Sequence, residues 1–240
     1  MASSTTISGG THDRPVPTMT EPSALWPEVL GRLVRREELA PELAAAALDT
    51  VLAGDATDAQ IAAFATLLRA KGETPAELAA LARAMLGRSE PIELADHGPL
   101  VDTCGTGGDR AGTVNVSTMA ALIAAGAGAT VAKHGNRAAS SQCGSADVLE
   151  ALGVVVDLGP KGVARCIADA GIGFCFAPRF HASMRFAGGV RRELGVPTTF
   201  NFLGPLANPA GATRRTVGVS DPTMAERMIG ALAELGVEHA

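Results

Sequence analysis

The sequence is poor in aromatic residues and in cysteine. Aromatic residues make up 3% of the 240 residues, with no tyrosine and one tryptophan, whereas alanine and glycine are abundant. This composition favours helices whose backbones approach closely and argues against a β-sandwich. No C-x-x-C pair occurs, so we expect thiols in a reducing cytoplasm, with zinc binding or disulfides as the alternatives. The four cysteines stand at positions 104, 143, 166 and 175.

Long apolar runs are also missing. The longest, residues 119–132, is rich in Ala and Gly and falls short of the ~18 residues that a membrane helix needs. Residues 1–20 are rich in Ser, Thr, Gly and Pro and have no apolar core, so they do not resemble a secretory signal. We expect residues 1–20 to form a disordered tail, and we expect a cytoplasmic protein with no membrane partner.

A strong charge of one sign is absent. Lys and Arg total 20 against 25 Asp and Glu, which gives a net charge of −5. This mild acidity argues against a nucleic-acid partner, although it leaves room for a local basic pocket. With 47% apolar and 19% charged residues, the chain is long enough to bury a sizeable core.

Residues 21–95 show the apolar period of helices. Capping boxes begin at Thr57 and at Thr74, and Gly54 and Gly72 stand where helices should end. We predict four helices with short links between residues 23 and 89, which form an all-helical domain. An apolar face left over after four short helices pack could pair with a second copy, so this domain is also predicted to mediate a homodimer.

After Pro91 the pattern changes to alternating strands and helices, which predicts a largely parallel α/β sheet domain over residues 96–240. The predicted strands are 99–102, 129–132, 154–156, 172–176 and 214–219, with another starting at 236–237. Helices are predicted at 117–127, 146–152, 160–170, 178–195 and 221–235. Residues 178–195 are polar and are candidates to pack with the helical domain. Ligands of such sheets bind at the carboxyl ends of the strands.

Three turns rich in glycine and hydroxyl side chains lie between Asp102 and Asp147. Bare backbone amides, hydroxyl donors and a lysine are the groups that bind phosphate. Neither the P-loop spacing nor the third glycine of the dinucleotide motif is present, since Arg110 takes that place. Asp102, Asp109 and Asp147 offer oxygens that could help to hold a divalent cation nearby.

Five sequence blocks, in order, resemble the anthranilate phosphoribosyltransferases, of nucleoside phosphorylase-like transferase fold. The resemblance spans roughly residues 20–240. The blocks are residues 102–109 (DTCGTGGD), 115–118 (NVST), 133–141 (KHGNRAASS), 190–195 (VRRELG) and 201–209 (NFLGPLANP). This resemblance implies transfer of a phosphoribosyl group from 5-phosphoribosyl 1-diphosphate to anthranilate in tryptophan biosynthesis. It also implies that the protein uses Mg²⁺ as a cofactor and forms a homodimer.

The same resemblance implies which residues form the site. Anthranilate would contact Gly105, Asn136 and Arg191, and Ser117 would be a magnesium ligand. Phosphoribosyl diphosphate would contact Gly105, Gly108, Asp109, Thr113, Asn115, Val116, Ser117, Thr118, Lys133, His134, Gly135, Asn136, Arg137, Ala138, Ala139, Ser140, Ser141 and Ser145.

The chemistry of the side chains fits these roles without a protein nucleophile. Arginine binds a carboxylate through a bidentate fork, which suits Arg191, whereas Arg192 points elsewhere on a helix and is interpreted as structural. His134 either orients the acceptor or is a loop histidine satisfied by backbone. We expect His181 to lie in the acceptor channel or on a helix surface. We expect residues 201–209 to form a loop near the acceptor.

The resemblance breaks at the C-terminus. Relatives of this kind usually continue to an adjacent Asp-Glu pair that binds magnesium, and no such pair follows in this sequence. We therefore expect an incomplete sheet, one incomplete metal site and weak or no transferase activity from this chain. Two other functions stay open: a nucleoside phosphorylase of related fold, whose lysine-serine-threonine glycine loop is absent, and a non-catalytic homologue.

Overall fold

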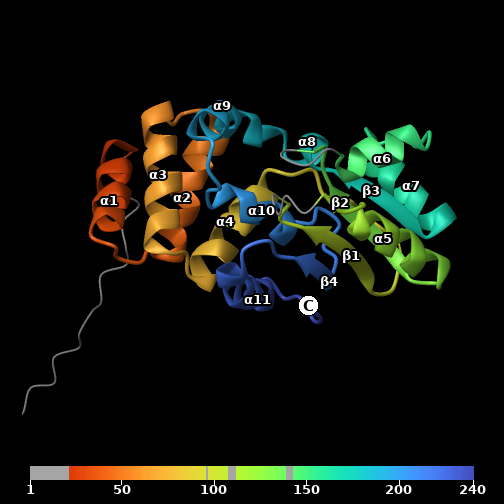
Figure 1. Ribbon diagram of the computed structural model, residues 1–240. Helices are drawn as coiled ribbons and strands as arrows, with labels where there is room; N and C mark the ends of the chain where they lie inside the picture. The colour runs from red at the N-terminus through yellow and green to blue at the C-terminus, as the bar shows by residue number, and fades with distance from the viewer. Residues whose placement is uncertain (1–21, 96, 108–111, 139–142) are drawn as a thin grey trace, which may run out of the picture.

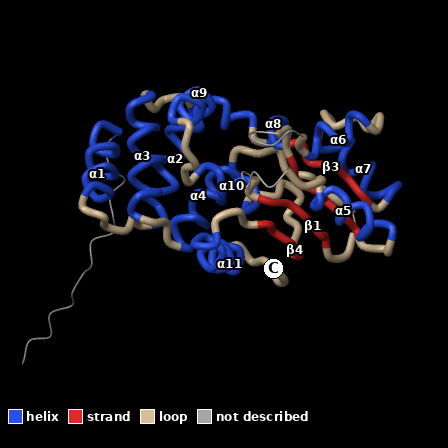
Figure 2. The backbone as a smooth tube through the Cα atoms, in the orientation of Figure 1, coloured by secondary structure: helices blue, strands red, loops and turns tan. Residues whose placement is uncertain are grey.

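A computed structural model describes residues 22–95, 97–107, 112–138 and 143–240. The tail expected at residues 1–20 lies outside the described residues. The described chain forms a group of helices at one end and a sheet with its own covering helices at the other (Figure 1). The strands lie together in the second part (Figure 2).

Four helices begin the described chain, as the sequence predicts. Thr57 and Thr74 each accept a hydrogen bond from the third residue of the helix that follows, so both predicted capping boxes form. Gly54 ends the second helix with a left-handed φ of 82°, a conformation that glycine adopts without steric cost. The helices are α1 (Pro22–Val34), α2 (Pro41–Ala53), α3 (Asp58–Lys71) and α4 (Pro75–Gly87).

The sheet has four parallel strands in the order β3-β2-β1-β4. Leu100 pairs with Thr130 and Val101 with Arg214, so β1 lies between β2 and β4. All three pairings are parallel, and the carboxyl ends of the strands therefore share one edge. The strands are β1 (Leu100–Gly105), β2 (Thr130–Gly135), β3 (Ile172–Phe176) and β4 (Arg214–Gly218).

Helices alternate with these strands. Helix α5 packs against β1 and β2, and α7 packs against β3. The elements are α5 (Val116–Gly126), α6 (Ser145–Ala151), α7 (Pro160–Ala170), α8 (Ala177–Phe180), the 3₁₀ turn η1 (Ala182–Met184), α9 (Arg185–Leu194), α10 (Phe200–Leu206), the 3₁₀ turn η2 (Pro222–Met224) and α11 (Ala225–Glu234). None of the described helices is long and apolar enough to cross a membrane.

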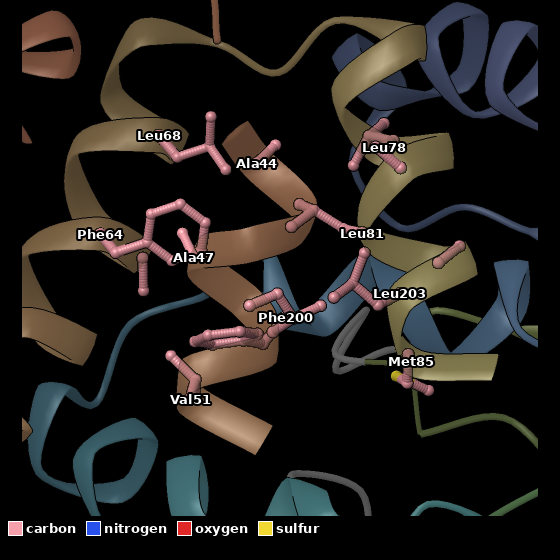
Figure 3. Close-up of a cluster of buried hydrophobic side chains, with 14 of the residues drawn as sticks. Ala44, Ala47, Val51, Phe64, Leu68, Leu78, Leu81, Met85, Phe200 and Leu203 are labelled. Atoms are coloured by element: carbon pink, nitrogen blue, oxygen red, sulfur yellow. The ribbon is translucent and has the colours of Figure 1, made fainter. Parts of the chain in front are cut away.

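Helices from the later part of the chain complete the core of the N-terminal bundle. Figure 3 shows Phe200 and Leu203 of α10 among Val51, Leu81 and Met85. Ala187 and Val190 of α9, together with Met224 and residues of α11, belong to the same buried cluster. Residues 185–194 thus pack with the helical bundle, although they follow β3 in sequence.

Two element predictions are wrong. Residues 154–156 form no strand, because Gly153 turns the chain with a φ of 82° and only Val156 of the three valines is buried, beside Leu149 and Phe176. Residues 201–209 are not mainly a loop, since Phe200–Leu206 is helix α10 with Phe202 and Leu203 buried. The strand expected from 236–237 is reduced to one parallel bridge between His239 and Arg214.

Candidate active site

Two neighbouring strands, β1 and β2, end in glycines at the same edge of the sheet. A side chain on Gly105 would lie 3.3 Å from the Gly218 carbonyl oxygen. A side chain on Gly135 would lie 2.8 Å from the Phe174 ring. Both positions therefore favour glycine. Directly after β1, the Thr106 amide donates to the Gly218 carbonyl oxygen at 2.9 Å.

Lys133 connects the end of β2 to the start of α5. Its Nζ donates to the Thr103 carbonyl oxygen at 2.6 Å and to Ser117 Oγ at 3.3 Å. Thr103 Oγ1 in turn donates to the Ser117 carbonyl oxygen at 2.7 Å. Lys133 is buried, and this burial lowers its pKa from the ordinary value. The structure thus holds a lysine ammonium against the first turn of α5, where helix amides lack intrahelical acceptors.

Asp102 is a buried link between strands rather than a cation ligand. Its Oδ1 accepts from the His134 amide at 2.9 Å, and its Oδ2 accepts from Asn208 Nδ2 at 2.8 Å. Asn208 also donates to the Ala132 carbonyl oxygen at 2.9 Å. Burial raises the pKa of Asp102, because removing the carboxylate from water disfavours its charge. Asp102 is fully buried and each of its oxygens already accepts a hydrogen bond, which disfavours the suggestion that it helps to hold a metal.

Asp147 organises the turn between β2 and α6. Its Oδ2 accepts from the Gly144 amide at 2.7 Å and from the Ala138 amide at 2.9 Å. These backbone hydrogen bonds keep the pKa of Asp147 below its usual value. Arg137 pairs with Asp147 at 3.4 Å and with Glu150 at 2.7 Å. Asp147 thus has a structural role in this turn.

The loops at the strand ends are tied to one another. Asn115 Nδ2 donates to the Cys143 carbonyl oxygen at 3.1 Å, which joins the start of α5 to the turn before α6. The Ala146 amide donates to the Asn136 carbonyl oxygen at 3.1 Å. Thr113 and Val116 are exposed beside this junction, and Ser145 is the first residue of α6.

Several predicted phosphoribosyl diphosphate contacts cannot be placed or are not exposed. Gly108, Asp109, Ala139, Ser140 and Ser141 lie outside the described residues. Asp109 therefore also goes untested as a cation ligand. Thr118 is buried, and its Oγ1 has no hydrogen-bond partner among the described residues.

Two buried histidines meet where β2 ends. His134 Nδ1 donates to the Gly204 carbonyl oxygen at 3.0 Å, and His181 Nε2 donates to the Ala207 carbonyl oxygen at 3.0 Å. Their rings meet edge to face with centroids 5.1 Å apart. Burial lowers the pKa of His134 to about 4 and that of His181 to about 3. Since a carbonyl only accepts, each neutral ring keeps one unprotonated nitrogen, and these nitrogens lack partners in the described chain.

The arginines of α9 differ in their environment. Burial lowers the pKa of Arg191, and its guanidinium makes no hydrogen bond or ion pair with the residues that the structure describes. Arg192 is exposed. Among the described residues no hydrogen bond joins Arg191 to Lys133 or Ser117, but the segment leading into α9 reaches β2 through the contact of His181 with His134. His181 is buried, so its placement on a helix surface is wrong.

Sequence reasoning missed the groups that hold these loops in place. Lys133 donates to the Thr103 carbonyl oxygen, and His134 donates to the Gly204 carbonyl oxygen. Asp102 accepts from the side chain of Asn208. One signal was available: an aspartate directly after the apolar run Leu100–Val101 is expected to be buried, and a buried carboxylate needs donors. The partners themselves come from residues up to 106 positions away.

Family models match both parts of the chain. A glycosyl transferase family helical bundle domain matches residues 27–89, and a glycosyl transferase family a/b domain matches residues 97–240. The anthranilate phosphoribosyltransferase of Roseiflexus castenholzii is 60% identical over 209 residues, which cover 87% of this chain and 61% of the relative. That of Salinispora arenicola is 58% identical over 213 residues, covering 88% of this chain and 60% of the relative.

Solved structures agree with this grouping. Anthranilate phosphoribosyltransferase from Thermus thermophilus has a TM-score of 0.83 and 46% identity, covering 87% of this chain and 63% of that one. The Saccharomyces cerevisiae enzyme in complex with PRPP and Mg has a TM-score of 0.82 and 29% identity, covering 91% and 65%. This chain spans about three fifths of the length of the curated relatives that it matches. It belongs to the glycosyl transferase family, and these relatives within it are anthranilate phosphoribosyltransferases.

Proposed function

We propose that the protein transfers the phosphoribosyl group of 5-phosphoribosyl 1-diphosphate to anthranilate, giving N-(5-phosphoribosyl)anthranilate and diphosphate. The observation that carries this proposal is the contact of Lys133 with both Thr103 and Ser117. It brings a cation, a helix N-terminus and two glycine-ended strands to one edge of the sheet, where a ligand with phosphates at both ends could bind.

The reaction needs binding and orientation more than covalent chemistry. The amine of anthranilate would attack C1 of the ribose while the bond from C1 to diphosphate breaks, so positive charge develops on the sugar and negative charge on the leaving group. Lys133 and the first-turn amides of α5 would stabilise that negative charge. Holding the amine beside C1 can supply roughly 7–11 kcal/mol at best. No residue of the chain is assigned a nucleophilic role.

The acceptor side is proposed from the α8–α10 region. The unprotonated nitrogens of His134 and His181 lack partners in the described chain but are buried, so the two rings would orient the acceptor indirectly, by holding the surrounding loops. Arg191 is a guanidinium without an ion-pair partner among the described residues, which suits recognition of a carboxylate. Asn136 and Gly105 stand at the ends of β2 and β1 and complete the proposed contacts.

Magnesium would bind partly through Ser117 Oγ, which still has a free lone pair after accepting from Lys133. When bound, the ion would neutralise charge on the diphosphate. In the ranges that the structure describes, no cluster of three or more His, Cys, Asp or Glu side chains could hold a metal. Mg²⁺ usually retains waters and substrate oxygens, so one protein hydroxyl fits a weak site.

The test separates the two substrates. Binding of anthranilate is followed by its fluorescence with phosphoribosyl diphosphate and magnesium present, and binding of phosphoribosyl diphosphate is followed by calorimetry. We expect Lys133→Ala to weaken phosphoribosyl diphosphate binding far more than anthranilate binding, and Arg191→Ala to do the reverse. Arg192→Ala is the matched control and should change neither. The opposite pattern in the two variants would mean that the pocket is assigned backwards.

Two further expectations concern the whole protein. We propose a homodimer formed through the helical bundle, which light scattering after size-exclusion chromatography tests. A clean monomer in that measurement would remove it. A cytoplasmic location is proposed from the biosynthetic role, and cell fractionation tests it.

A further inference from the structure

Helix α10 connects the N-terminal bundle to the sheet. It contacts α4 of the bundle and β2 of the sheet, and in the ribbon view it lies between the two (Figure 1). Phe202 and Leu203 of this helix are buried in the core of the bundle. A short helix that is packed at both ends moves as one rigid piece, so a group that holds one end also affects the other.

A buried carboxylate holds the start of α10. Thr199, the residue before the helix, donates from its Oγ1 to Glu73 at 2.6 Å. Glu73 lies between α3 and α4, is buried, and pairs with Arg69 at 3.2 Å and with Arg227 at 3.5 Å. The guanidinium of Arg69 also lies over the ring of Phe202, 5.0 Å from its centroid. Hydrogen bonds to a carboxylate are stronger than those between neutral groups, so Glu73 fixes the start of the helix firmly.

The other end of α10 holds the two buried histidines. The Gly204 carbonyl oxygen accepts from His134 Nδ1, and the Ala207 carbonyl oxygen, directly after the helix, accepts from His181 Nε2. The two rings are therefore opposite tautomers, with the proton on Nδ1 of His134 and on Nε2 of His181. His134 precedes Gly135, where β2 ends. The position of α10 thus sets the position of this strand end.

These contacts form a chain from the bundle to the acceptor side. We propose that Glu73 is a positioning residue, which acts through Thr199 and α10 to set where the histidine pair and the adjoining end of β2 lie. The phosphate side is held in another way, since Lys133 donates to Thr103 and Ser117 rather than to α10. The effect on anthranilate rests on the proposed function, whereas the placement of the histidines can be measured without a substrate.

Two substitutions loosen the start of α10 in different ways. Thr199→Val removes the hydroxyl that donates to Glu73, and Glu73→Gln removes the charge that this hydroxyl contacts. In protein labelled with ¹⁵N-histidine, we expect both variants to shift the ring signals of His134 and His181 and to mix their tautomers. Thr199→Ser keeps a hydroxyl and should restore the original signals. If Glu73→Gln does not fold, Thr199→Val and Thr199→Ser decide the test.

Glu77→Gln is the matched control. Glu77 is buried like Glu73, but it accepts from the Leu39 amide and from Lys71 Nζ, each at 2.8 Å and both within the N-terminal bundle. We expect this variant to lose stability without moving the histidine signals. Histidine signals that stay unchanged in Thr199→Val, or that shift as much in Glu77→Gln, would overturn the proposal.

Substrate binding gives a second readout. With phosphoribosyl diphosphate saturating, we expect Thr199→Val to weaken anthranilate binding about tenfold and to change phosphoribosyl diphosphate binding by less than about twofold. Unchanged anthranilate binding alongside shifted histidine signals would overturn the role of Glu73 in the acceptor side. If the unsubstituted protein binds neither substrate, the proposed function fails, and the histidine signals still decide whether Glu73 positions the pair.

Discussion

At the scale of single residues, the candidate site depends on buried polar groups that satisfy one another. Asp102 has both carboxylate oxygens hydrogen-bonded, one by a backbone amide of β2 and one by Asn208. The sequence indicates that Asp102 is buried and needs hydrogen-bond donors, because it directly follows apolar residues of a strand. It does not identify Asn208, because a partner over a hundred residues away follows from the tertiary fold and not from local pattern.

Removing Asn208 should therefore destabilise the protein. Asn208→Ala deletes the donor to Asp102 and to the Ala132 carbonyl oxygen, and it leaves a buried carboxylate oxygen without a partner. We expect the free energy of unfolding, measured by urea denaturation at pH 7, to fall by roughly 2–4 kcal/mol. Asn136→Ala, at an exposed position, is the control. A loss below that of the control would show that the Asp102 contact is not stabilising.

The buried histidines predict how stability changes with pH. His134 titrates near 6.5 when unfolded, but burial lowers its folded pKa to about 4. The unfolded state therefore binds more protons between these values, and stability present above pH 6.5 is lost as the pH falls. From pH 7 to pH 5 this histidine alone should remove about 2 kcal/mol. In His134→Asn the loss over that range should be smaller by a similar amount; an identical loss would refute the burial of a neutral ring.

At the scale of elements, the boundaries of the N-terminal helices were predictable, whereas loop packing and the division of residues 178–195 into α8, η1 and α9 were not. Thr57 and Thr74 cap their helices as their sequences indicate, because capping is a contact within four residues. The valines at 154–156 have strand propensity, but no strand of the described residues pairs with them. Residues 201–209 contain turn formers, yet burial of Phe202 and Leu203 against the bundle favours helix α10.

Alanine substitution should affect stability in opposite directions at two glycines, Gly144 in the turn between β2 and α6 and Gly126 in α5. A side chain on Gly144 would lie 2.3 Å from the Ala138 amide nitrogen, which is backbone and cannot move aside. Gly126, in the last turn of α5, has nothing within 4 Å. We expect Gly144→Ala to lower the melting temperature and to weaken binding of phosphoribosyl diphosphate. Gly126→Ala should stabilise by up to about 1 kcal/mol. Similar melting temperatures for both variants would contradict the close approach at Gly144.

At the scale of the whole molecule, the four N-terminal helices and the later part of the chain share one buried carboxylate as well as apolar contacts. Glu73 of α3–α4 is buried and accepts from Thr199 Oγ1 at 2.6 Å. It also pairs with Arg69 at 3.2 Å and with Arg227 at 3.5 Å. Arg69 in addition pairs with Asp221. The two-part organisation was predictable from the change of period after Pro91, but this junction was not, because it joins residues from distant parts of the sequence.

Neutralising Glu73 should loosen that junction. Glu73→Gln keeps the shape of the side chain but leaves two arginines without their shared carboxylate, so we expect a loss of roughly 2–4 kcal/mol of unfolding free energy. Calorimetry should also show a broader transition as the two parts unfold less cooperatively. Glu28→Gln removes an exposed ion pair with Arg32 at 3.4 Å and should change stability by less than about 1 kcal/mol. Equal effects would mean that Glu73 does not join the two parts.

Hydrogen–deuterium exchange with magnesium and phosphoribosyl diphosphate tests most directly whether the loops after β1 and β2 together form one phosphate-binding site, called here the shared cradle. We expect the ligand to slow exchange in the peptides that contain Gly105 to Ser117 and Lys133 to Ser145, while peptides of α1 and α2 keep their rates. Slower exchange confined to other parts of the chain, or in only one of these two segments, would contradict a shared cradle.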